Sequence, residues 1–130
     1  PGQPIADDIW LEEGCKIHPS AKLIGPIVMG RGCTIEQDIE ISGPTVLGSG
    51  CIIGQGSTID EAILWQNVKL GKNVTIRNSV VGNNTVIGDN TWVTDGSIIS
   101  DNVIVGSDNK LEHGIKVWAG KTIEDNAISF

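Results

Sequence analysis

The chain has 130 residues, a formal net charge of −7, 17 glycines and an aromatic content of only 4%, with one Phe and no Tyr. Lys and Arg never cluster beyond two residues, which excludes a surface for nucleic acid or for an anionic membrane. The length fits one domain over residues 1–130. Neither an 18-residue apolar run nor a signal-peptide pattern occurs, so we expect a soluble, cytoplasmic protein.

An aliphatic residue recurs every six residues from Ile5 to Ile123, with two five-residue steps, one near Ala62–Trp65 and one near Asn78–Val81. Only 39% of the chain is hydrophobic, so chance does not produce such a series. Because aromatic side chains are nearly absent, the core must be filled by these aliphatic side chains stacked in a regular way. The 21 positions are Ile5, Leu11, Ile17, Leu23, Met29, Ile35, Ile41, Leu47, Ile53, Ile59, Leu64, Leu70, Ile76, Val81, Ile87, Val93, Ile99, Val105, Leu111, Val117 and Ile123.

The other positions of each six-residue unit repeat as well. The fifth position is small or β-branched, and the third and fourth carry Gly, Asn or Asp, as in Arg31-Gly32 and Asn83-Asn84. Gly, Asn and Asp tolerate a positive φ, so each unit is a short strand followed by a tight corner. Three corners close a triangle, and 21 units predict about seven triangular coils, a prism roughly 34 Å long.

This pattern, [LIV]-[GAED]-x-x-[STAV]-x, resembles that of the hexapeptide-repeat family over residues 5–128. The resemblance implies an all-β fold, a left-handed parallel β-helix. Left-handed crossovers are an exception to the rule that β-crossover-β connections are right-handed, so that rule alone would mislead here.

Three cysteines, Cys15, Cys33 and Cys51, are spaced by 18 residues and share the fifth position, so we expect them to stack on one corner of the prism. Three aligned thiols could bind a soft metal ion. We favour the simpler interpretation, in which each cysteine is one more small inward residue and a free thiol, and we predict no metal site.

The two histidines, His18 and His113, are the candidates for catalysis in one alternative interpretation. Some hexapeptide-repeat proteins are acyltransferases that use a His as general base at a subunit interface. The two residues lie about five coils apart, so they form no pair and supply no three-His zinc site. No inserted loop or helical segment interrupts the repeats to build a substrate cleft. We therefore predict no catalytic and no cofactor-binding residue in this chain.

Four tryptophans fall outside the inward positions and should lie on the outer faces. Exposed Trp on a flat face is a plausible contact with another subunit or domain. The open ends of a β-helix also expose strand edges and apolar core, which favours self-association. The possible interface residues are Trp10, Trp65, Trp92 and Trp118.

A finer resemblance points to one subgroup of the family. Residues 63–71 and 76–82 look like the C-terminal β-helix of sugar-nucleotide pyrophosphorylases, which carries a similar S-V-L-W-x-x-V-x-I-G run. Residues 17–26 resemble the I-H-P-x-A-x-x-x-G-P entry of the mannose-1-phosphate guanylyltransferase branch. Residues 114–121 resemble its G-V-K-I-W-P-x-K ending, with Ala119 where Pro is usual.

This resemblance implies that catalysis occurs in an N-terminal α/β domain with a G-x-G-T-R-L nucleotide loop and Mg²⁺, neither of which this sequence supplies. The chain, which opens at Pro1, is then a C-terminal fragment of a longer nucleotidyltransferase that serves oligomerisation, stability or regulation. Its expected partners are further copies of itself and the catalytic domain of the same chain. Two alternatives stay open: a hexapeptide-repeat acyltransferase acting at a trimer interface, and a binding or purely structural β-helix.

Overall fold

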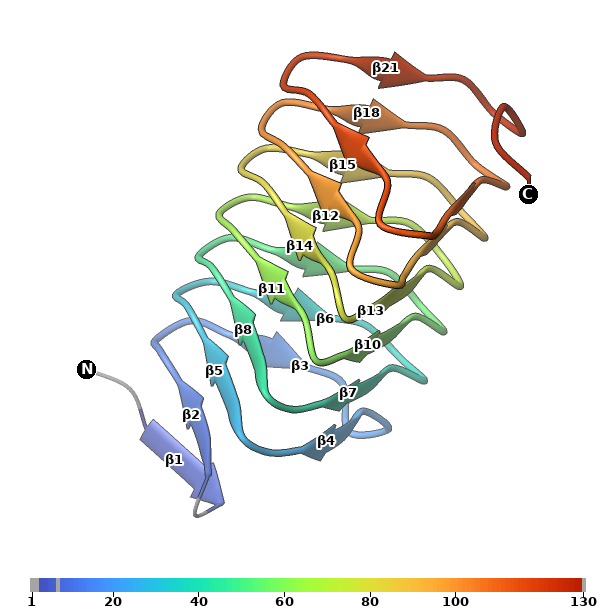
Figure 1. Ribbon diagram of the computed structural model, residues 1–130. Coiled ribbons are helices and arrows are strands. Elements are labelled where there is room, and N and C mark those ends of the chain that lie inside the picture. The colour runs from blue at the N-terminus through green and yellow to red at the C-terminus, as the bar shows by residue number, and fades with distance from the viewer. Residues whose placement is uncertain (1–2, 7, 130) are drawn as a thin grey trace.

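The computed structural model describes residues 3–6 and 8–129, which form 21 short strands and no helix. The chain winds as a three-sided coil along one axis, with the two termini at opposite ends (Figure 1). From β2 onward, successive strands lie in different sheets, and each strand pairs in parallel with the strand one coil further on. The fold is the left-handed parallel β-helix that the repeat implies. In the described part of the chain, no helix is long and apolar enough to cross a membrane.

The strands form three sheets, one on each side of the prism. Sheet A consists of β1 (Gln3–Ala6), β2 (Ile9–Leu11), β5 (Ile27–Met29), β8 (Thr45–Leu47), β11 (Ile63–Leu64), β14 (Val80–Val81), β17 (Ile98–Ile99) and β20 (Lys116–Val117). Sheet B consists of β3 (Lys16–Ile17), β6 (Thr34–Ile35), β9 (Ile52–Ile53), β12 (Lys69–Leu70), β15 (Val86–Ile87), β18 (Ile104–Val105) and β21 (Thr122–Ile123). Sheet C consists of β4 (Lys22–Ile24), β7 (Glu40–Ser42), β10 (Thr58–Asp60), β13 (Thr75–Arg77), β16 (Trp92–Val93) and β19 (Lys110–Leu111).

The first strand departs from the expected repeat. β1 pairs with β2 in an antiparallel register, with Gln3 opposite Leu11 and Pro4 opposite Trp10. Only two positions separate these strands, and so short a connection joins antiparallel strands, whereas a parallel pair needs a much longer crossover. The hexad around Ile5 is therefore not a coil strand. From β2 to β21 the described residues form six full coils and two further strands, slightly fewer than the expected seven.

The two five-residue steps fall where the sequence predicts them, on the corner between sheets C and A in two successive coils. Glu61 and Asn78 each take a positive φ of 49° there, which turns the chain within fewer residues. The register is preserved, because Ile59 still pairs with Ile76. The aliphatic ladder thus continues without a break despite the missing residues.

The inward ladder is confirmed as the core. From Met29 to Val117 every position of the aliphatic series is buried, and the fifth-position residues fill the corners beside it. The series is only half-buried at Leu11, Ile17, Leu23 and Ile123, because the coil has no further turn there to cover them. Fifth-position hydroxyls donate to the backbone of the next coil; Thr85 Oγ1, for example, donates to the carbonyl oxygen of Ser100 at 2.8 Å.

Candidate functional site

The three cysteines stack along one corner, as their spacing predicts, and all are free thiols. Each Sγ donates to a backbone carbonyl of the next coil: Cys15 to Gly30 at 3.1 Å and Cys33 to Gly48 at 3.1 Å. Burial raises the pKa of the Cys15 thiol, and a hydrogen bond with the Cys51 thiol together with burial raises that of Cys33. Protonated, hydrogen-bonded thiols such as Cys15 and Cys33 are structural side chains and poor nucleophiles. The hydrogen bond with Cys33 lowers the pKa of the Cys51 thiol, but Cys51 is fully buried and also donates to the Trp65 carbonyl at 3.0 Å.

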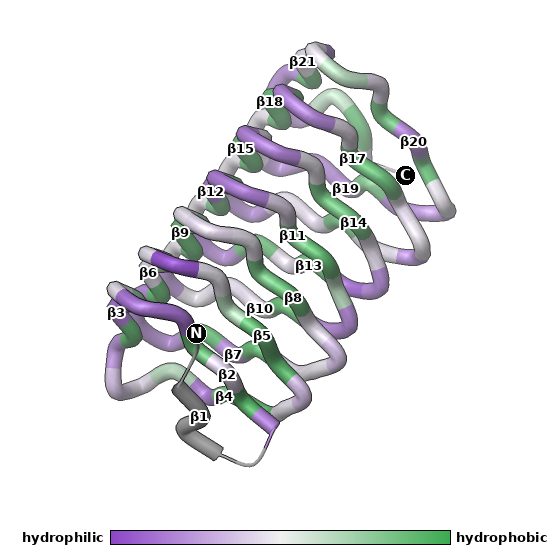
Figure 2. The backbone as a smooth tube through the Cα atoms, turned by 90° about the vertical axis from the view of Figure 1, so that its left-hand side faces the viewer, coloured by the Kyte–Doolittle hydropathy of each residue, from purple (hydrophilic) through white to green (hydrophobic). Residues whose placement is uncertain are grey.

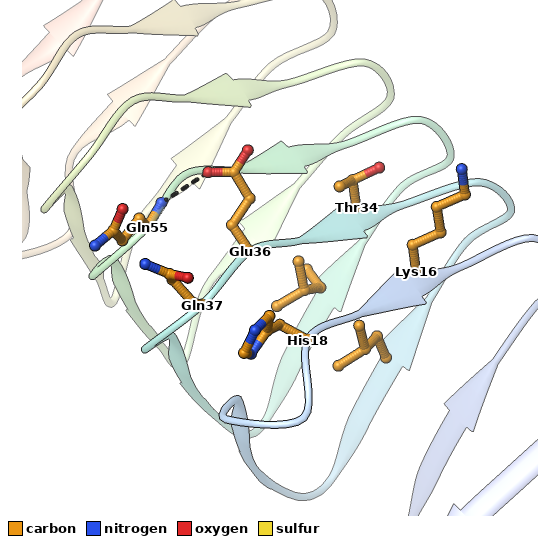
Figure 3. A pocket seen from close by; sticks show the side chains of 8 residues that line it. Lys16, His18, Thr34, Glu36, Gln37 and Gln55 are labelled. Carbon is orange, nitrogen blue, oxygen red and sulfur yellow. Dashed lines mark hydrogen bonds between the residues drawn. The ribbon is translucent and has the colours of Figure 1, made fainter.

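His18 lies beside a shallow hollow of about 490 Å³ near the N-terminal end of sheet B (Figure 3). Its Nδ1 lies 2.8 Å from the hydroxyl oxygen of Ser20, which also accepts a hydrogen bond from the backbone N–H of Asp38. Glu36 faces the same hollow, and its Oε1 accepts from the backbone N–H of Gln55 at 3.1 Å. The bonds from Asp38 to Ser20 and from Gln55 to Glu36 each tie a polar side chain to the next coil and so secure the corners.

His113 lies on a different corner of the prism, between β19 and β20, whereas His18 follows β3 on the corner between sheets B and C. The structure therefore does not bring the two histidines together; five coils separate them. His113 has a φ of 59°, and Asp95, one coil before it, has the same φ of 59°. His113 is thus an exposed corner residue. Among the described residues, no three His, Cys, Asp or Glu side chains gather as metal ligands would.

The four tryptophans are exposed, as their positions in the repeat predict. Three of them belong to sheet A: Trp10 lies on β2, and Trp65 and Trp118 directly follow β11 and β20. Trp92 lies apart from them on sheet C, with the Lys110 ammonium 5.2 Å from its ring centre. The tryptophans are therefore not one patch, but three of the four border one face.

That face carries an apolar column that the sequence reasoning did not single out. On sheet A the outward residues, one from each coil, are apolar over six successive coils. The strands β5, β8, β11, β14 and β17 of this sheet are coloured hydrophobic in Figure 2. We call this column the ridge; it consists of Trp10, Val28, Val46, Ile63, Val80 and Ile98. The sequence does contain the pattern of the ridge. From Trp10 to Ile98, in every third hexad, the one that lies on sheet A, the sixth residue is apolar, and this becomes visible only when the hexads are grouped by sheet.

A groove runs beside the ridge. Two hollows, of about 920 and about 400 Å³, lie between ridge residues and the residues that directly follow the strands; Trp65, which follows β11, lines both hollows and separates them. We call their floor the groove; it consists of Gly30, Gly48, Gly82 and Ser100. Coil stacking requires these glycines, since a Cβ on Gly48 would lie 2.7 Å from the backbone carbon of Trp65. The close packing of backbones thus leaves a trough beside the ridge.

The family model of the EIF2B subunit epsilon LbH domain matches residues 6–111 of the chain. A comparison with curated protein sequences finds no match.

Several solved structures with a similar fold are acyltransferases. The N-acyltransferase AntD from Bacillus cereus, solved with dTDP and coenzyme A, is 13% identical with a TM-score of 0.78, covering 83% of this chain and 75% of that one. The acetyltransferase domain of PglB from Neisseria gonorrhoeae is 20% identical with a TM-score of 0.80, covering 86% and 55%. PerB from Caulobacter crescentus, solved with CoA and GDP-perosamine, is 24% identical with a TM-score of 0.75, covering 80% and 51%. At these identities the likeness concerns the fold, and the chain spans about half the length of the last two proteins.

Proposed function

Because the chain belongs to the family of the EIF2B subunit epsilon LbH domain, we propose that it is the non-catalytic β-helix domain of a sugar-1-phosphate nucleotidyltransferase. Its role is assembly and stability of an enzyme whose chemistry occurs elsewhere in a longer chain. The family match is the observation that carries the proposal, and the pyrophosphorylase-like runs at residues 63–71 and 76–82 narrow it to sugar-nucleotide enzymes. Three unpaired thiols fit a reducing, cytoplasmic compartment.

The N-terminal end of the coil supports a partner domain there. β3 and β4 are the first strands of sheets B and C, and their outer edges have no strand partner among the described residues. Leu11, Ile17 and Leu23 are only half-buried at this end. Unpaired edges above apolar side chains favour coverage by another folded unit. We assign that place to the catalytic domain of the same chain.

In this proposal the catalytic domain would hold the NTP, the sugar 1-phosphate and the Mg²⁺ that offsets phosphate charge. Attack of the sugar phosphate on the α-phosphorus would form the sugar nucleotide and release pyrophosphate. No residue of the present chain is assigned to that reaction, to the metal ion or to a cofactor. Its contribution is to hold catalytic domains in a fixed arrangement.

The test is the complete gene and its product. We expect an upstream α/β domain with a Gly-rich G-x-G-T-R-L loop, and a full-length protein that releases pyrophosphate from an NTP and a sugar 1-phosphate. A gene that encodes no such domain would refute the proposal. Titration of this domain with acetyl-CoA tests the competing acyltransferase function, since measurable binding that depends on His113 or His18 would favour that function instead.

A further inference from the structure

We propose that sheet A is the surface through which two copies of this chain pair, with their coils parallel and related by a two-fold axis along the coil direction. This inference rests on the proposed role in assembly and adds the face, the partner and the geometry. The backbones of the three sheets are nearly the same, but their outward side chains differ.

The ridge on sheet A is apolar over six successive coils. Five of its residues are about two-fifths to half exposed, as for Val46 at 43% and Trp10 at 47%, and Val80 is half-buried. On sheet B polar residues interrupt the apolar ones; the corresponding column reads Lys16, Thr34, Ile52, Lys69, Val86, Ile104 and Thr122. On sheet C one apolar residue stands among polar ones; the column reads Lys22, Glu40, Thr58, Thr75, Trp92 and Lys110. Charged and polar residues break up apolar edges and patches in monomeric proteins, and the ridge has none until Lys116.

The ridge and the groove lie side by side on sheet A, and this arrangement is self-complementary. A two-fold axis in the contact plane, parallel to the coil axis, exchanges the two sides of the face but keeps the height along the coil. It therefore sets the ridge of each copy over the groove of the other, with Val46 facing Gly48 and Val80 facing Gly82 of the second copy. Between these two pairs, Ile63 faces Trp65, which is 53% exposed and separates the two hollows of the groove. Isologous pairing of one patch with itself is the commonest form of homodimer.

The other two-fold arrangement, with antiparallel coils, is less favourable. An axis along the strands sets ridge against ridge and groove against groove, which leaves the troughs beside Gly30 and Gly82 unfilled. Voids of this kind lose dispersion contacts along their whole lining. The parallel arrangement fills them with Val and Ile side chains from the second copy.

The charges at the C-terminal end of the face agree with the parallel arrangement. Lys116 ends the ridge column, and Trp118, 76% exposed, ends the groove side. At equal height the two-fold axis sets Lys116 of each copy over Trp118 of the other, a favourable cation–π geometry. The chain already uses this contact on sheet C, between Lys110 and Trp92 at 5.2 Å.

The size of the face sets the expected strength of the pairing. Seven strands at about 4.8 Å give a length of about 29 Å, and four residues across give about 13 Å, so each copy covers roughly 380 Å². The total of about 750 Å² lies below that of most stable complexes and in the range of weak ones. We therefore expect this domain alone to dimerise with a Kd of about 10 µM to 1 mM, and the full chain to pair more tightly.

Sedimentation velocity between about 5 and 500 µM tests the face. Val46→Lys places a charge on the ridge; its matched control is Val86→Lys, the same change at the same position of the repeat on sheet B, where Val86 is 40% exposed. We expect the unsubstituted chain to dimerise, Val46→Lys to weaken the dimer at least tenfold, and Val86→Lys to leave it unchanged. Far-UV circular dichroism checks that both variants fold.

A cross-linking pair tests the geometry. Ile98 of one copy should face Ser100 of the other, so a mixture of the Ile98→Cys and Ser100→Cys variants should form a heterodimer with a short bismaleimide more readily than either variant alone. A chain that stays monomeric at 500 µM, equal effects of Val46→Lys and Val86→Lys, or no preference for the mixed cross-link would overturn this inference. None of these results would bear on the upstream catalytic domain, which the complete gene tests separately.

Discussion

Ile76 lies at the middle of the inward ladder, and its truncation tests whether that ladder is the packed core of the protein. The side chain is fully buried on β13, stacked between Ile59 and Val93 of the adjacent coils. Ile76→Ala removes three carbon atoms, about 2.4 kcal/mol at about 0.8 kcal/mol for each methylene. Backbone hydrogen bonds hold the coils at a fixed spacing, so the cavity closes little and the loss should lie between about 2.5 and 5 kcal/mol.

Urea denaturation followed by far-UV circular dichroism measures this loss. Ile104→Ala is the control, because Ile104 points outward from sheet B and is 54% exposed; we expect a loss below about 1 kcal/mol there. Ile123→Ala, half-buried in the last strand, should fall between the two. A loss for Ile76→Ala no greater than for Ile104→Ala would refute the stacked ladder as the source of stability.

Three further predictions concern the corners and the end of the coil. Asn109→Leu should destabilise the chain by about 1–3 kcal/mol and speed hydrogen exchange after Asp125, because the buried amide of Asn109 donates to the Glu124 carbonyl at 3.0 Å and its oxygen accepts from two backbone N–H groups. Gly48→Ala should lower the urea midpoint by an amount equivalent to about 1–3 kcal/mol, since its Cβ meets backbone; Ser100→Ala, in the same column, should change it little. Cys33 is fully buried, so Ellman's reagent should label it only on unfolding, with a rate that follows urea denaturation.

The sequence alone predicts the coil because each residue of the hexad has one physical task that repeats. An inward aliphatic at every sixth residue, from Leu11 to Ile123, defines the ladder, and the Gly, Asn and Asp pairs define the corners; Asn84, for example, has a φ of 61°. Even the two shortened corners could be located, since the aliphatic series resumes after each one. The outward position of the tryptophans follows from the same periodicity.

Other features depend on contacts that the period does not encode. β1 carries Ile5 in register with the repeat, yet its short connection makes it an antiparallel hairpin with β2. Asn109 occupies a fifth position where small or β-branched residues predominate, and its amide serves the last corner instead. Trp92 is exposed, as are the other three tryptophans, but it lies on sheet C, away from the three that border sheet A.

The hexad period does not reveal the ridge on sheet A. A β-helix has three faces of nearly equal backbone geometry, and only the outward side chains distinguish them. Sheet C carries polar pairs such as Arg77 with Asp60, 3.9 Å apart, which contribute little to stability but keep that face hydrated. Sheet A instead carries apolar outward residues such as Val46 and Ile63. A difference of this kind appears only after the residues are sorted by face.

The glycines connect the stability of the coil with its capacity to pair. Gly48 and Gly82 are required because neighbouring backbones leave no room for a Cβ, so coil packing alone would select them. The trough that they leave beside Val46 and Val80 is a consequence of that packing. In the proposed pair, the ridge of the second copy fills this trough. Variants of the ridge can therefore separate pairing from folding, whereas variants of the glycines change both.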